Sequence, residues 1–250
     1  MVVAVRLIRP GRLVAAVLSV MVAGGSFLAL SRLSDDAGAL TGPPARAERG
    51  TGLVQSLAGP SSSEAPIAVP GTPAFARVRG LTLHLPARRP GGIAYHEASR
   101  TRAVMLTPLG RCVRNENRTK FKMPPPTPGP RYVVMSSRGR GRPATSAVDV
   151  AMITGAKVLS PITGTVSRVK RYRLYGVYRD FRLSLKPAGQ AELRTIVLHV
   201  SDLRVRPGSV VVAGVTELGS VRSFPFRSQV NDYFGRGIPH VHVEVQRVGA

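Results

Sequence analysis

The 250-residue sequence contains no tryptophan and a single cysteine, Cys112. One thiol excludes an intrachain disulfide and a zinc cluster built from cysteines, and Cys112 is best interpreted as a small buried apolar residue. Because tryptophan is absent and basic residues do not alternate with aromatic ones, the sequence lacks the stacking surfaces typical of proteins that bind single-stranded nucleic acid. A nucleic-acid partner is therefore not expected.

Long helical periodicity is also missing, and 26 glycines with 21 prolines argue against a helical bundle. In its place, short strand-like runs separated by glycine-marked turns recur in the second half of the chain. These runs cover residues 131–136, 146–151, 156–159, 164–174, 181–186, 193–201, 209–213 and 240–248. The sequence therefore predicts an all-β domain of antiparallel sheet.

The formal net charge is +23, with 36 basic and 13 acidic residues. Such an excess concentrates polyanions near the protein, whether nucleic acid, anionic lipid or the phosphate polymers of a bacterial wall. A composition rich in arginine, alanine, glycine and proline can also reflect a biased genome. The compartment decides which polyanion is relevant.

The N-terminus indicates that compartment. Arg6, Arg9 and Arg12 precede an apolar run over residues 13–30, which is typical of a secretory signal. Its length is close to the roughly 20 residues that a membrane-spanning helix needs, so residues 1–39 are either a signal peptide, cleaved near Ala37–Ala39, or an uncleaved signal anchor. Both alternatives place the rest of the chain outside the cytoplasm.

Three further segments follow. Residues 40–74 are rich in Ala, Gly, Pro and Ser without periodicity, which predicts a disordered linker. Residues 75–130 form a poorly defined lead-in segment that ends in the proline-rich stretch 120–130, where we expect an extended connector and a domain boundary. The predicted β domain covers residues 131–248.

The last predicted strand carries two of the chain's five histidines. Since alternate residues of a strand face the same side, His240, His242 and Glu244 share one face and the intervening valines line the other. This pattern suits metal ligation combined with proton transfer. Taken alone, a His-x-His pattern is more typical of polar residues on a solvated sheet face.

Several segments follow known motifs in a fixed order. Residues 146–151 and 155–166 are similar to a "His-x-Gly-x-Asp-Ile" opening and the glycine-valine run after it. Residues 196–201 and 205–214 resemble a "Tyr-x-His-Leu-Ser" segment with its glycine-rich continuation, and residues 239–245 resemble a closing "Pro-His-Leu-His-Phe-Glu-Val". Over about residues 131–248 the chain thus resembles the lysostaphin/LytM-type zinc endopeptidases of the bacterial cell wall, which carry these motifs in this order.

This resemblance implies a LytM-like antiparallel β fold, described as a duplicated hybrid motif, with a groove for peptidoglycan peptides and a zinc ion bound by His, Asp and His. Matched position by position, Asp149 and His242 fall on metal ligands. His199 and His240 fall on the two histidines that handle the proton and the developing oxyanion. Glu244 is placed to orient one of these imidazoles.

The family's first zinc histidine is replaced by Thr145, four residues before Asp149. Catalytic zinc ordinarily needs three protein ligands, and Asp149 with His242 supplies only two. Zinc is therefore expected to bind weakly or not at all. An upstream residue could substitute, namely His96 with Glu97, His84, Asn115 or Asn117, but the sequence favours His84 and His96 as solvent-facing loop residues.

The sequence thus favours an exported pseudoenzyme that binds peptidoglycan peptides and acts on another wall hydrolase. The alternative is an active zinc metalloendopeptidase with a substitute third ligand, so enzymatic activity stays uncertain at this stage. A third possibility is adhesion to anionic wall polymers or lipid through arginine runs at residues 138–142 and 168–173.

Overall fold

The computed structural model describes residues 70–118, 121–122, 125 and 127–249. The expected signal peptide or anchor over residues 1–39 and nearly all of the expected linker lie outside this range. Within the described residues, no helix has the length and apolar character needed to cross a membrane.

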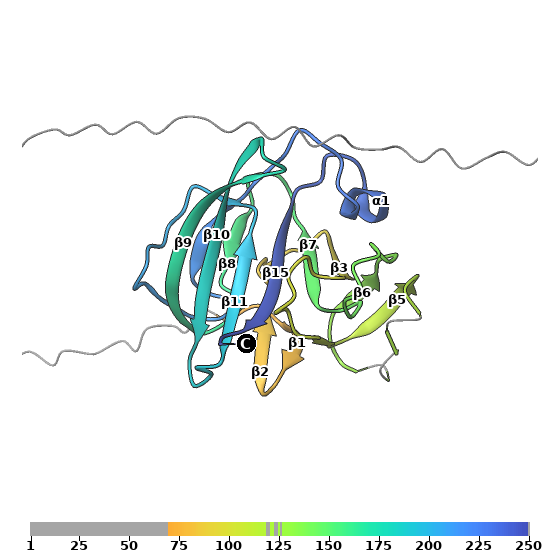
Figure 1. Ribbon diagram of the computed structural model, residues 1–250, viewed down its shortest axis with the longest axis horizontal. Coiled ribbons are helices and arrows are strands. Elements are labelled where there is room, and N and C mark those ends of the chain that lie inside the picture. The colour runs from red at the N-terminus through yellow and green to blue at the C-terminus, as the bar shows by residue number, and fades with distance from the viewer. Residues whose placement is uncertain (1–69, 119–120, 123–124, 126, 250) are drawn as a thin grey trace, which may run out of the picture. The chain divides into compact units, whose positions relative to one another are not determined.

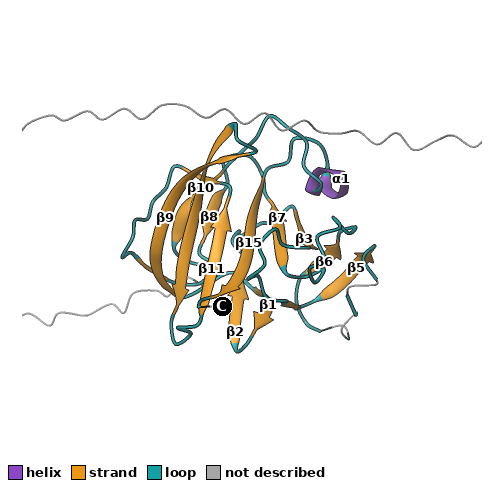
Figure 2. Ribbon diagram, viewed as in Figure 1, coloured by secondary structure: helices purple, strands orange, loops and turns teal. Residues whose placement is uncertain are grey.

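The described part of the chain is almost entirely β structure, which confirms the predicted fold class (Figure 2). Its one short helix is α1 (Val230–Phe234). The strands of the first half are β1 (Ala74–Val78), β2 (Leu81–His84), β3 (Gly92–His96), β4 (Thr107–Pro108), β5 (Arg111–Asn115), β6 (Arg131–Val134) and β7 (Ala147–Ala151). Those of the second half are β8 (Lys157–Leu159), β9 (Gly164–Leu174), β10 (Tyr178–Pro187), β11 (Leu193–Leu198), β12 (Val200–Ser201), β13 (Val210–Val211), β14 (Glu217–Val221) and β15 (His240–Arg247).

Nine of these strands form one sheet in the order β13-β9-β10-β11-β15-β7-β3-β6-β5 (Figure 1). Its pairs are antiparallel except that β6 runs parallel to both β3 and β5. Two smaller sheets, β2-β1-β4 and β12-β14-β8, complete the fold. The antiparallel arrangement predicted from the sequence therefore holds for most of the large sheet.

Strand β3 joins the segment before the proline-rich stretch to the segment after it. It pairs with β7 on one side and with β6 on the other, so it lies inside the large sheet. Residues of β1 and β3, such as Phe75 and Tyr95, belong to the same buried core as Val148 and Val243. The lead-in residues are thus built into the same sheet and core as the strands that follow.

Alternation along the central strands separates a core face from a polar face. Ile93 and Tyr95 of β3 and Val148 and Val150 of β7 are at most 2% exposed and face the core. The valines of β15, at positions 241, 243 and 245, do the same. Each such side chain contributes about 1.5–3 kcal/mol through burial, so the registers of β3, β7 and β15 are strongly fixed.

Cys112 on β5 is half-buried and packs against the edge of the core. Its thiol donates to the Arg114 carbonyl at 3.1 Å, and burial raises its pKa. A raised pKa lowers the thiolate fraction, so Cys112 is a poor nucleophile and metal ligand.

The sharing of one core by β3 and β7 predicts that residues 131–249 do not fold alone. Without β3, the inner edge of β7 loses its hydrogen-bonding partner, and Val148 and Val150 lose Ile93 and Tyr95 as core neighbours. We expect cooperative thermal unfolding for residues 70–249 and none for residues 131–249, measured by circular dichroism and calorimetry. A cooperative transition in the shorter fragment would contradict this assignment.

Candidate metal centre and its groove

The sheet registers place the candidate ligands on three neighbouring strands. His242 of β15 lies directly opposite Asp149 of β7, and Asp149 lies opposite Ala94 of β3. His96 follows Ala94 by two residues, so it shares that face. Opposite residues on one face bring side chains within contact distance, so His96, Asp149 and His242 converge over the polar face of the sheet.

These three residues form a compact, buried cluster. Asp149 Oδ1 lies 3.0 Å from His96 Nε2 and 2.9 Å from His242 Nδ1. The ligand atoms all lie within 4.8 Å of one another. Two ligands of a tetrahedral zinc ion at about 2.1 Å are separated by roughly 3.4 Å, so small adjustments would let these atoms share one ion.

The far nitrogen of each histidine is also placed for metal binding. His96 Nδ1 lies 2.9 Å from the Glu97 carbonyl, to which it can donate, and His242 Nε2 lies 3.5 Å from Glu244 Oε2. Metal-binding histidines characteristically donate their second ring nitrogen in this way. His96 Nε2 is buried and, despite its proximity to Asp149, makes no hydrogen bond of acceptable geometry within the described residues. A cation accepting its lone pair would satisfy it, and two imidazoles with a carboxylate suit zinc.

The expectation that Asp149 and His242 lack a third partner is therefore wrong. His96 is 1% exposed and part of a central strand, so its interpretation as a solvent-facing loop residue is also wrong. Thr145, at the position where the zinc endopeptidases that the sequence resembles carry histidine, is fully buried and donates to the Leu106 carbonyl at 2.7 Å. Its hydroxyl has a structural partner, and the imidazole comes from the neighbouring strand.

The other upstream residues considered as a third ligand make their contacts elsewhere. His84 lies on β2, where its Nδ1 contacts the Thr72 carbonyl at 2.6 Å. Asn115 accepts a hydrogen bond from the backbone of Asn117, and neither asparagine lines the groove described below. Among the substitutes considered from the sequence, only His96 reaches the centre.

Burial and mutual charge set the protonation states. Burial alone would raise the pKa of Asp149, but His96 and His240 beside it hold that pKa well below its usual range. Burial would lower the pKa of His242, yet its contacts with Asp149 and Glu244 raise it to about 9. Burial lowers the pKa of His96, and it lowers the pKa of His240 to about 4. Without metal, the excess proton of the cluster therefore resides on His242.

Glu244 lies beside His242, with its Oε2 3.5 Å from His242 Nε2. It follows His242 by two residues on the same face of β15 and is 2% exposed. Burial acts to raise its pKa, but His242 and Arg182 lower it. Gln246 donates to Glu244 Oε1 at 2.5 Å, which further fixes the carboxylate.

His199 and His240 lie beside the cluster with their ring centroids 5.1 Å apart. His240 Nε2 is 3.9 Å from Asp149 Oδ2. His199 stands between β11 and β12 with a φ of 67°, a left-handed conformation that is costly for a residue with a side chain. The sheet thus turns His199 towards the same opening as His240.

The sequence did not indicate Asp180, the residue that forms a hydrogen bond with the His199 ring. Asp180 of β10 is buried, and its Oδ2 lies 2.8 Å from His199 Nδ1 and accepts the Tyr172 hydroxyl at 2.5 Å. With Nδ1–H donated to Asp180, the Nε2 lone pair of a neutral His199 faces outward. The only sequence signal for Asp180 is an acidic residue inside an otherwise basic strand pair, which does not specify a partner.

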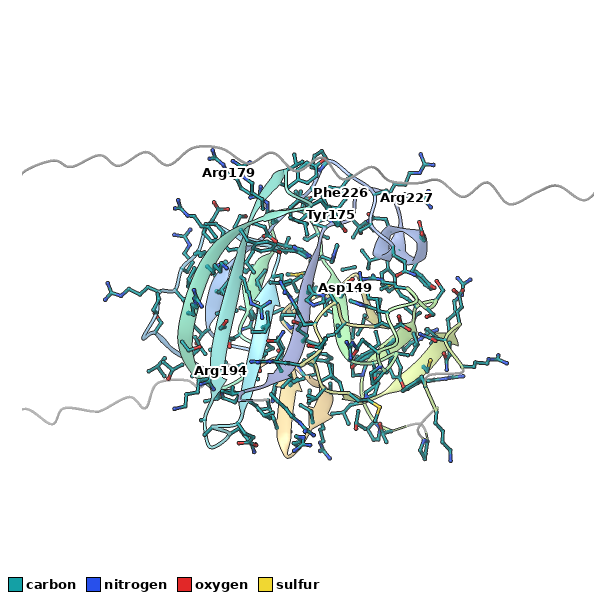
Figure 3. The ribbon with its side chains drawn as sticks, viewed as in Figure 1. Asp149, Tyr175, Arg179, Arg194, Phe226 and Arg227 are labelled. Carbon is teal, nitrogen blue, oxygen red and sulfur yellow. The ribbon has the colours of Figure 1, made fainter. Side chains whose placement is uncertain are left out.

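His96 is buried beside Asp149 and His242, which line a groove of about 590 Å³. Its rim includes Tyr175 from the β9–β10 turn and Phe226 with Arg227 from the loop before α1, which Figure 3 shows on the same side of Asp149. Tyr175 and Phe226 contact each other edge-on at 5.3 Å between centroids. Arg138, part of the arginine run noted in the sequence, enters the groove and lies 3.6 Å from Asp149 Oδ2.

Comparison with protein-family models and with curated proteins finds no match. Comparison with solved structures finds peptidases. Lysostaphin in solution shares 21% identity over 42% of this chain, with a TM-score of 0.31. A zinc-containing peptidase from Vibrio cholerae shares 23% over 40%, with a TM-score of 0.29, and the catalytic domain of the prophage-encoded M23 protein EnpA from Enterococcus faecalis shares 20% over 52%, with a TM-score of 0.29.

The chain spans 37% of the lysostaphin chain, 26% of the Vibrio cholerae peptidase and 83% of the EnpA catalytic domain. At such low identities and TM-scores, the functional assignment depends on the side-chain geometry of this chain.

The ligand assignment predicts that substitution of one buried residue weakens zinc binding, whereas substitution of another lowers only the folding stability. His96→Ala should weaken zinc binding by about a hundredfold or more, because it removes one of three ligands. Thr145→Val should leave zinc stoichiometry unchanged and destabilise folding by about 1–3 kcal/mol, because the Leu106 carbonyl loses its donor. Zinc content by atomic emission and denaturant unfolding measure the two effects. Full zinc occupancy in His96→Ala would refute the assignment.

The raised pKa of His242 predicts that zinc binding becomes tighter as pH rises. Below about pH 9 the metal must displace one proton from His242, whereas His96 is already neutral and Asp149 already ionised. The apparent affinity should increase about tenfold per pH unit between pH 6.5 and 8, measured by competition with a chromophoric chelator at each pH. An affinity independent of pH over this range would contradict the proton assignment.

Proposed function

We propose that this chain is a zinc metallopeptidase of the lysostaphin/LytM kind that cleaves peptides of peptidoglycan. The observation that carries the proposal is the convergence of His96, Asp149 and His242, which replaces the ligand set that the sequence leaves one donor short. The groove above the cluster and the two further imidazoles at its base support catalysis rather than a purely structural metal.

In this proposal His96 Nε2, Asp149 Oδ1 and His242 Nδ1 hold the ion. When bound, zinc would lower the pKa of a coordinated water towards 7 and polarise the carbonyl of the scissile peptide. The chain's own contribution is to keep both imidazoles in one tautomer, His96 through the Glu97 carbonyl and His242 through Glu244. Orientation of this kind determines ligand basicity.

His199 and His240 supply the proton chemistry. When its Nδ1–H is donated to Asp180, His199 presents its Nε2 lone pair to the groove, so it can accept a proton from the attacking water and return it to the leaving amine. Burial keeps the pKa of His240 at about 4, so its neutral ring can donate one N–H bond to developing negative charge on the peptide oxygen. Asp180 and Tyr172 are positioning residues in this scheme.

The non-hydrolytic binding module is the second candidate, and Arg138 is the observation that favours it. Its guanidinium lies 3.6 Å from Asp149 Oδ2, where a positive charge opposes binding of a divalent cation. In that case the groove would hold peptide without cleaving it, and another wall hydrolase would be the functional partner. Its original motivation, a missing third ligand, no longer applies.

The N-terminal sequence supports a location outside the cytoplasm, where peptidoglycan lies. A basic start followed by the apolar run 13–30 is typical of a signal peptide or a signal anchor. The net charge of +23 would add attraction to anionic wall polymers or lipid.

Incubation of the purified full-length protein with peptidoglycan tests the function directly. We expect new amino groups to appear during digestion, activity to be lost with chelator and restored by stoichiometric zinc, and muropeptide mass spectra to show cleaved cross-links or stems. Binding to peptidoglycan without cleavage by the zinc-loaded protein would favour the second candidate and overturn the first.

Asp180→Asn tests the positioning of His199. Loss of the carboxylate removes the fixed acceptor for Nδ1–H, so we expect kcat/KM to fall by about 10- to 100-fold with zinc content unchanged. Asp202→Asn is the matched control, since this exposed residue loses the same charge three positions from His199 and bonds only to the Ser201 hydroxyl. Equal activity of the two variants would exclude a role for Asp180.

A further inference from the structure

The groove lining carries an excess of basic side chains, as the chain as a whole does. Two acidic side chains, Asp149 and Glu244, face six basic ones. The basic residues are Arg100, Arg138, Arg140, Lys170, Arg182 and Arg227. A bound zinc ion would add two further positive charges, so the groove is matched to a ligand that carries negative charge.

Four of the six basic side chains already contact an acidic side chain or a backbone carbonyl of the protein. Arg227 pairs with Asp232, and Arg138 contacts Asp149. Arg140 donates to the Glu97 carbonyl, and Arg182 lies 3.9 Å from Glu244. In the part of the chain that the structure describes, Arg100 and Lys170 have no ion-pair partner although both line the groove.

These two residues gather around Arg182 at one end of the groove. Lys170 of β9 lies directly opposite Arg182 of β10, an arrangement of like charges that destabilises a sheet. Burial lowers the pKa of Arg182, and the nearby charge of Arg100 lowers it further. Glu244 partly offsets the charge of Arg182, whereas the exposed Arg100 and Lys170 have no ion-pair partner among the described residues, so an anionic ligand group would pair with them.

The sheet register connects this cationic cluster to the metal centre. Lys170, Arg182, Leu198, His242 and Asp149 lie directly opposite one another on five consecutive strands. With strands about 4.8 Å apart, Arg182 lies roughly 10 Å and Lys170 roughly 14 Å from His242 along this row. An extended peptide advances about 3.3 Å per residue, so these distances correspond to about three to four residues.

We propose that Arg100, Lys170 and Arg182 form a subsite for a free carboxylate of the substrate peptide, about three to four residues from the cleaved bond. This inference rests on the proposed function, because it takes the ligand to be a peptide. A carboxylate is favoured over a wall phosphate polymer because the cluster opens into the same cavity as the candidate ligands, so one extended molecule reaches both. The groove would thereby select acidic peptides.

Blocked glycine peptides test the subsite. Acetylated and amidated pentaglycine and hexaglycine would carry one glutamate at each position in turn, with matched glutamine peptides of the same shape. For the full-length zinc-loaded protein, we expect one glutamate position to improve binding, measured by calorimetry, by about five- to twentyfold over glutamine. Cleavage of the same peptides is measured in parallel.

Arg100→Gln/Lys170→Gln should abolish this preference and leave zinc content and glutamine-peptide binding unchanged. Arg102→Gln/Lys186→Gln is the control: it removes the same charge from two exposed side chains outside the groove and should retain the preference. Equal loss in both double variants would indicate a general charge effect and overturn the subsite.

The outcomes separate the subsite from the proposed function. Cleavage without any preference for glutamate would overturn the subsite and leave the peptidase function standing. A glutamate preference in binding, lost in the groove variant and accompanied by no cleavage, would support the subsite and contradict the peptidase function. Tighter binding of poly(glycerol phosphate) than of every glutamate peptide, lost in the same variant, would assign the cluster to a phosphate polymer and overturn the carboxylate.

Discussion

The antiparallel pairing of β3 with β7 is the contact on which the rest of the site depends. It places Ala94 opposite Asp149 and therefore His96 on the same face as that carboxylate. A shift of one residue would turn His96 into the core and Tyr95 towards the groove. Burial of Ile93 and Tyr95 on the opposite face stabilises the register, so the core indirectly fixes the position of the third ligand.

The cluster buries charged groups, which is costly, and each of these groups has a partner of opposite charge or a hydrogen-bond partner beside it. Asp149 is surrounded by His96, His240, His242 and Arg138, so its negative charge is stabilised although it is 3% exposed. Each of three imidazoles has one nitrogen held by an oxygen acceptor: the Glu97 carbonyl, Glu244 or Asp180. In the proposed peptidase, the remaining nitrogens would face the ion or the groove.

The replacement of one ligand by another from a neighbouring strand has a simple geometric basis. A metal ion requires donor atoms at the right distances and angles, and the order of those ligands in the sequence does not matter. Thr145 precedes β7 and bonds to the Leu106 carbonyl, whereas His96 approaches from the adjacent strand. Ligand spacing along one segment is therefore an incomplete guide to a metal centre in a sheet, where the nearest neighbours are cross-strand.

The sequence by itself determined the all-β class and the shared face of His240, His242 and Glu244, because both follow from the two-residue period of a strand. Its motifs also indicated Asp149 and His199 as candidate site residues. Only the tertiary structure brought His96 to Asp149, Asp180 to His199, and Lys170 into line with His242. These contacts join residues 53, 19 and 72 positions apart, and they depend on which strands are neighbours in the sheet. Strand neighbours are chosen by packing of the whole core, and that information is absent from local spacing.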